Sequence, residues 1–163
     1  YMVWLVLDLL LARTTATVNE RKPYALWSLV LVALVYLMIL SGALVAGTDA
    51  GFAYSTWPLM GDSFIPRGLY ATSPAWLAMF EDITTIQFNH RMFAYVLFVV
   101  LSASAMLVYR STTQGYGRLA AILLVVALCV QVILGISTLL LQVPVALGTA
   151  HQGGAVLLLA VRC

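Results

Sequence analysis

Two histidines occupy similar positions in two apolar segments of the sequence. His90 lies in "QFNHRMFAY", residues 87–95, and His151 lies in "LGTAHQGGAVLLLA", residues 147–160. They are the only 2 histidines among 163 residues. An imidazole binds metals, relays protons or packs as a neutral side chain. A single histidine in an apolar run is typical of a packing residue, so any chemistry rests on the pair.

The composition predicts the environment of these histidines. Hydrophobic residues make up 63% of the chain and charged residues 9%, whereas soluble proteins carry roughly half and a quarter. This indicates an integral membrane protein. A membrane-crossing helix needs about 20 apolar residues, so there is room for four or five. A net charge of +2 gives no argument for nucleic-acid binding.

The apolar runs predict an all-α membrane protein, with a transmembrane four-helix bundle preceded by a partial helix. Residues 1–12 are expected to be the tail of a preceding transmembrane helix, and residues 13–23 an inside loop. Residues 24–163 are expected to form the four-helix domain, with an outer loop at residues 47–83. Its spans are expected at about Tyr24 to Ala46, Thr84 to Tyr109, Arg118 to Gln142, and from Leu147 onward.

Loop charges predict the orientation of the bundle. Residues 13–23 and the turn from Arg110 to Arg118 are basic, and short basic loops face the cytoplasm or the matrix. The long loop sets Arg67 against acidic residues, so we expect it outside: Asp49, Asp62, Glu81 and Asp82. Both histidine-bearing spans then start on the outer side. At 1.5 Å per residue, His90 and His151 lie roughly 6–10 Å below their helix starts.

The outer loop is rich in glycine, proline and aromatic residues, which favour the membrane interface. Residues 73–83 are expected to form a short amphipathic helix, with Ser73 as its cap and Pro74 as its first helical residue. We expect the loop to fold over whatever the histidines hold. A plain interfacial anchor is the alternative.

Two imidazoles at one depth can meet between antiparallel helices, as axial ligation of a haem iron requires. Zinc needs three or four protein ligands, and only Glu81 and Asp82 lie near the pair in sequence. A porphyrin already gives iron four nitrogens. Cys129 and Cys163 lie elsewhere in apolar runs and are expected to be buried thiols. Structural or proton-relay histidines remain open alternatives.

Three segments, in order, resemble the carboxyl-terminal half of the haem A synthase family: "GALVAGTDAGFAYSTWPLMGDSFIP", "QFNHRMFAY" and "LGISTLLLQVPVALGTAHQGGAVLLL". This family oxidises the C8 methyl of haem O to a formyl group for cytochrome c oxidase biogenesis. The resemblance implies two similar four-helix halves, each with a histidine pair. The substrate haem O is implied in the other half, so the catalytic residues are unknown here.

The resemblance also implies roles for individual residues. His90 and His151 match the family's histidines and would be the axial iron ligands of a b-type haem. Arg91 is a candidate for binding a haem propionate, with an interfacial position as the alternative. Gln87, Asn89 and Gln152 are candidates for hydrogen bonds to an imidazole or a propionate, although helix packing explains each of them too.

The implied partners are membrane lipid, the amino-terminal half of the same chain or a second copy, haem O synthase and an electron donor. The expected location is the mitochondrial inner membrane, with a bacterial plasma membrane as the alternative. Two other functions remain open. One is a bis-histidine electron-transfer subunit without its own catalysis, and the other is a transporter or proton relay.

Overall fold

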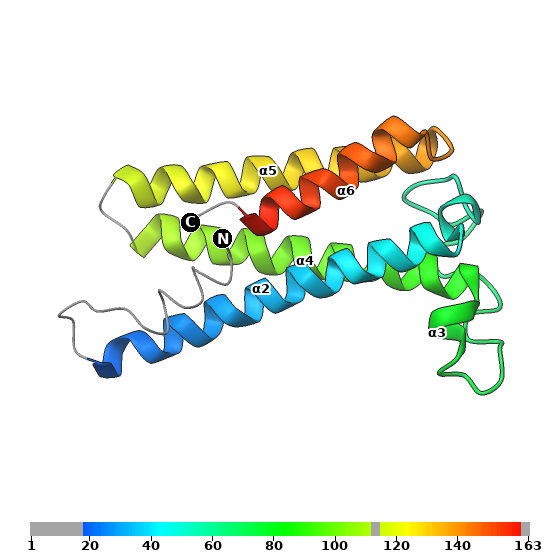
Figure 1. Cartoon of the computed structure of the whole chain (residues 1–163), viewed down its shortest axis with the longest axis horizontal. Helices are drawn as coiled ribbons and strands as arrows, with labels where there is room; N and C mark the ends of the chain where they lie inside the picture. Colours follow the sequence, from blue (N-terminus) through cyan, green and yellow to red (C-terminus); the bar gives the residue numbers. More distant parts are fainter. Residues whose placement is uncertain (1–17, 112–114, 161–163) are drawn as a thin grey trace.

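The computed structural model describes residues 18–111 and 115–160 of the chain (Figure 1). The partial helix expected at residues 1–12 lies outside them, as does Cys163. Four helices of 16 to 30 residues dominate the described part: α2 (Val18–Gly47), α4 (Ile83–Ser111), α5 (Gly115–Leu140) and α6 (Val145–Ala160). The all-α membrane fold predicted from the apolar runs is confirmed.

Three of these helices contain segments long and apolar enough to cross a membrane: Leu26–Gly47, Ile83–Ser111 and Gly117–Leu140. A fourth apolar segment, Val145–Leu159, is shorter. Helices suit the bilayer because they satisfy every backbone hydrogen bond within the segment. The helix α2 begins at Val18 instead of Tyr24, so residues 18–23 are helical and not part of the inside loop. Polar residues end an apolar span without ending the helix, since helical hydrogen bonds need no apolar side chains.

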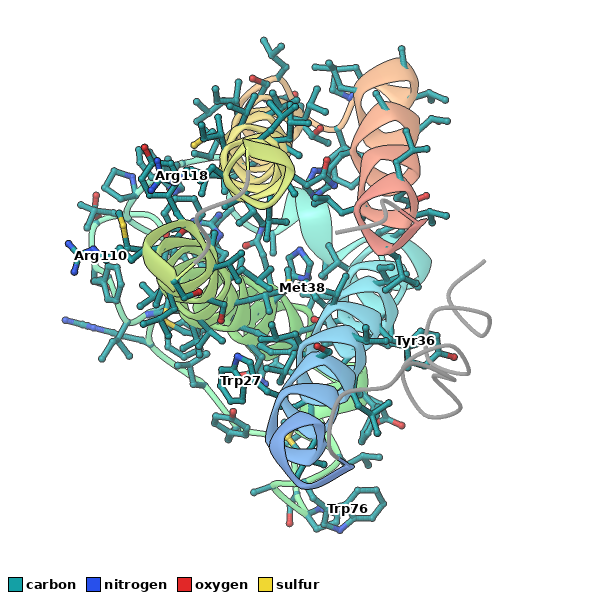
Figure 2. All side chains as sticks on the ribbon, turned by 90° about the vertical axis from the view of Figure 1, so that its left-hand side faces the viewer. Trp27, Tyr36, Met38, Trp76, Arg110 and Arg118 are labelled. Atoms are coloured by element: carbon teal, nitrogen blue, oxygen red, sulfur yellow. The ribbon has the colours of Figure 1, made fainter. Side chains whose placement is uncertain are left out.

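The four long helices form a closed ring. The packed pairs are α2 with α4, α4 with α5, α5 with α6, and α6 with α2. Helices α4 and α6 therefore stand diagonally opposite each other, as do α2 and α5. Figure 2 looks along the helices and shows this ring, with Met38 of α2 on its inner side and Tyr36 on its outer side.

The buried apolar cluster lies further from the loop at residues 47–83 than the histidines do. Leu97, Leu101 and Leu128 form a buried cluster, against which Met38 and Phe98 also pack. Leu97 follows His90 by seven residues, which places it about 10 Å further along α4. Cys129 is exposed on α5, so the expectation that it is buried was wrong.

The long loop packs on the carboxyl end of α2 and the amino end of α4. It contains the short helices η1 (Ala50–Phe52) and α3 (Ala78–Glu81) and an isolated bridge between Met60 and Ser63. Ala50, Met60 and Ala78 are buried within it, so the loop has a small core of its own. The expected helix at residues 73–83 is wrong in extent. Only the four residues of α3 are α-helical, and neither Ser73 nor any other side chain caps them.

Asp82 instead caps the following helix, α4. Its carboxylate accepts the Thr84 N–H at 3.0 Å and the buried Thr85 hydroxyl at 2.6 Å. The hydroxyl of Thr85 in turn accepts the backbone N–H of Tyr70 at 3.0 Å. The start of α4 and the end of the loop are therefore joined through one carboxylate and one hydroxyl.

We predict that Asp82→Ala lowers the free energy of unfolding by about 1 kcal/mol, as loss of a helix N-cap does. The Thr84 N–H and the Thr85 hydroxyl lose their acceptor together. The thermal unfolding midpoint of the detergent-purified protein measures the effect. Asp62→Ala, at an exposed loop carboxylate, is the control. Equal midpoints in the two variants would contradict the capping role.

Candidate functional site

His90 lies on α4 and is held by two consecutive residues of α2. Its Nδ1 atom is 3.0 Å from the hydroxyl of Ser41. The neighbouring Gly42 comes so close that a Cβ atom there would lie 3.4 Å from Cε1 of the imidazole. The α2 backbone therefore forms a wall against this ring, and Ser41 supplies the hydrogen bond.

His151 lies on α6 and packs against α5. A Cβ atom at Gly135 would lie only 2.8 Å from Cε1 of the imidazole and 3.3 Å from Nε2. Gln131, one turn earlier on α5, donates a hydrogen bond to the main-chain carbonyl of His151. Nδ1 of this ring is buried and has no hydrogen-bond partner among the described residues. The hydrogen bond from Gln131 thus fixes the backbone of His151, and the close fit against Gly135 positions its ring.

The two histidines lie on diagonally opposite helices of the ring. Each imidazole lies against a glycine of an adjacent helix, His90 against Gly42 and His151 against Gly135. The pairing of the histidines expected from their common depth stays a prediction.

Gln87 and Arg91 face the loop, one turn apart on α4. The guanidinium of Arg91 donates to the carbonyls of Thr56 at 2.9 Å, Leu59 at 3.3 Å and Tyr54 at 3.0 Å. The amide of Gln87 donates to the carbonyl of Tyr54 at 3.0 Å. Both side chains are buried. Nε of Arg91 and Oε1 of Gln87 lie in the interior without a partner among the described residues.

The other two polar candidates lie away from the imidazoles. Asn89 accepts a hydrogen bond from the Tyr70 hydroxyl at 2.8 Å, so it contacts the loop. Gln152 is exposed, although it follows His151 directly, because neighbouring residues on a helix point about 100° apart. No hydrogen bond joins either residue to a histidine in the part of the chain that the structure describes.

Sequence reasoning missed Ser41 and Gln131. Gln131 is an amide in the middle of an apolar span, and such polar residues tend to face the bundle interior, so it carried a usable signal. Ser41 carried a weaker one, because serine is common in transmembrane helices. Gly42 and Gly135 are small residues, and the sequence does not show which side chains they face.

The two imidazoles suit an iron whose other four ligands are the nitrogens of a porphyrin. No group of three or more histidine, cysteine, aspartate or glutamate side chains capable of holding a metal occurs among the described residues. Two opposed imidazoles can supply both axial ligands of a haem, whose porphyrin supplies the other four. The two glycines allow close approach from the flanking helices. The residues present therefore fit a haem better than a bare cation.

Known proteins resemble this chain over nearly all of its length. The family model described as "Cytochrome oxidase assembly protein" (COX15-CtaA) matches residues 1–163. A protein of Nitrosospira multiformis named "Heme A synthase" is 44% identical over 96% of this chain and 44% of its own length. Proteins of the same name are 41% identical in Allorhizobium ampelinum, over 96% of this chain, and 40% identical in Chelativorans sp., over 86%.

The chain spans less than half the length of these relatives, 44%, 43% and 38% respectively. No solved structure matches it. The family match covers the whole chain, and the relative from Nitrosospira multiformis aligns with 96% of it. The chain belongs to the COX15-CtaA family of cytochrome oxidase assembly proteins.

Proposed function

We propose that this chain is the part of a haem A synthase that binds a b-type haem, with His90 and His151 as its axial ligands. The observation that carries the proposal is the pair of histidines on diagonally opposite helices, each with its ring against a glycine of a flanking helix. An added Cβ atom would lie 2.8 Å from the His151 ring at Gly135 and 3.4 Å from the His90 ring at Gly42. Helix packing alone does not require both features at one depth.

The neighbouring residues support the pair in different ways. Ser41 orients His90 through Nδ1, and Gln131 fixes the backbone that carries His151. When bound, the haem supplies reversible one-electron chemistry at its iron. The protein supplies the two ligands, an apolar surround and a fixed ligand orientation. Exclusion of water by the apolar surround strengthens each of these polar contacts.

Arg91 and Gln87 both donate hydrogen bonds to carbonyls of the loop. The Arg91 guanidinium donates hydrogen bonds to three loop carbonyls. These bonds tether residues 54–59 to α4. This tether supports the expectation that the loop covers the histidine site. The proposed propionate contact of Arg91 remains a prediction. Its buried Nε, which has no partner among the described residues, is the group that would make the contact.

For the complete protein, we propose oxidation of the C8 methyl of haem O to a formyl group. The relatives named heme A synthase support this. Two histidines on one iron leave no open position for a substrate, so the pair suits electron transfer better than the oxidation itself. The haem O site and the catalytic residues then belong to the amino-terminal half or to a second copy of the chain.

The same geometry is compatible with a haem-binding electron-transfer subunit without its own catalysis, and two axial ligands on one iron favour it as the second candidate. A multi-pass membrane location follows from the apolar helices. Relatives from bacteria support a bacterial plasma membrane over the mitochondrial inner membrane. Haem O synthase and an electron donor remain the proposed partners.

His90→Ala and His151→Ala, made in the complete protein, are each expected to remove the low-spin b-type signal of this site. Each variant deletes one of the two axial ligands. Reduced-minus-oxidised spectra and haem content per protein measure the loss. Thr149→Ala is the control, because its hydroxyl is exposed and bonds only to Val145 of the same helix. Unchanged spectra in both histidine variants would refute the site.

Gly135→Ala is expected to lower haem content or to shift the haem toward high spin. The added methyl would lie 2.8 Å from the His151 ring and force it from its position. Gly148→Ala is the matched control, since nothing lies within 4 Å of a Cβ atom there. Equal haem content and equal spectra in the two glycine variants would show that Gly135 does not seat the ligand.

Conversion of haem O to haem A separates the two candidate functions. The unmodified complete protein should form haem A when supplied with haem O, oxygen and a reductant, as measured by chromatography of extracted haems. Both histidine variants should lose most of that conversion, because the electron path is broken. A complete protein that holds haem but forms no haem A would favour the electron-transfer subunit.

A further inference from the structure

The two histidines differ in the hydrogen bonding of their Nδ1 atoms. Nδ1 of His90 has a hydroxyl partner, Ser41, at 3.0 Å. Nδ1 of His151 is buried and has no partner in the described ranges. The contact from Gln131 reaches the main chain of His151 and not its ring. The two rings thus have unequal hydrogen bonding at equivalent atoms.

This inequality has a chemical consequence at a haem. When Nε2 of a histidine binds iron, the remaining ring proton is on Nδ1, so His90 would donate its N–H to the oxygen of Ser41. A hydrogen bond from the ring N–H makes the imidazole a stronger electron donor. A stronger donor stabilises ferric over ferrous iron and lowers the midpoint potential. His151 receives no such support from a side chain among the described residues.

We propose that Ser41 is a positioning residue that acts through His90. It holds the His90 ring through Nδ1, and it makes His90 the more strongly donating of the two ligands. This inference rests on the proposed haem site. It adds that the site is asymmetric and that its potential is set in part from α2, a helix that bears neither histidine.

The packing around Ser41 supports this role over simple space filling. The next residue, Gly42, lies against the His90 ring, since a Cβ atom there would be 3.4 Å from it. Ser104 offers a contrast on α4. Its side chain is buried, and its hydroxyl bonds to the Val100 carbonyl of its own helix at 2.8 Å.

The test compares Ser41→Ala, Ser41→Thr and Ser104→Ala in the complete protein. Haem content, the midpoint potential from a redox titration and the ferric EPR spectrum are measured for each. Ser41→Ala should keep its haem with a raised midpoint potential. We expect the ratio of oxidised to reduced haem at a fixed potential to fall roughly tenfold, which corresponds to about 59 mV for one electron. Ser41→Thr keeps the hydroxyl and should restore the original potential, and Ser104→Ala should not change it.

Each outcome decides between two roles for Ser41. Bound haem with an unchanged potential and EPR spectrum in Ser41→Ala would overturn the inference and leave the haem site intact. Loss of haem from both Ser41 variants would assign the residue to packing and also overturn it. Loss of haem from Ser41→Ala alone would support the need for the hydroxyl. Retention of the b-type signal in His90→Ala and His151→Ala would instead refute the haem site itself.

Discussion

Burying a polar imidazole among apolar helices costs free energy, and this cost constrains the part of the bundle that holds His90 and His151. A polar ring in a membrane span needs a hydrogen bond, a metal or an opposed partner, because lipid offers none of these. His90 obtains a hydroxyl from Ser41. The ring of His151 retains one buried nitrogen without a partner in the described part of the chain. A haem at the proposed site would take Nε2 of each ring and leave Nδ1 of His151 without a partner among the described residues.

The ring of four helices makes such a ligand geometrically possible. Because α4 and α6 are diagonally opposite, each histidine lies against one of the flanking helices. Those helices, α2 and α5, contribute glycines where the imidazoles lie. Leu97 and Leu101 of α4 and Leu128 of α5 form the buried apolar cluster between the helices.

The outer loop depends on the helix that carries His90. Arg91, the next residue, holds three loop carbonyls, and Asp82 and Thr85 hold the loop where α4 begins. A buried guanidinium needs several acceptors, and the backbone of residues 54–59 provides them. Displacement of the loop would therefore leave a buried cation without these acceptors beside His90. The contacts of the loop and the position of His90 are coupled through adjacent residues of one helix.

The sequence by itself determined the all-α membrane fold and the order of its long apolar helices, because apolar run length acts locally. It also supplied the family resemblance. It did not determine that α2 begins at Val18, that α3 is only four residues long, or that Arg91 binds the loop. Only the tertiary structure decided that Ser41 meets His90 and that Gly135 seats His151. Such contacts depend on how each helix is rotated about its axis, which is set by packing between residues far apart in the chain.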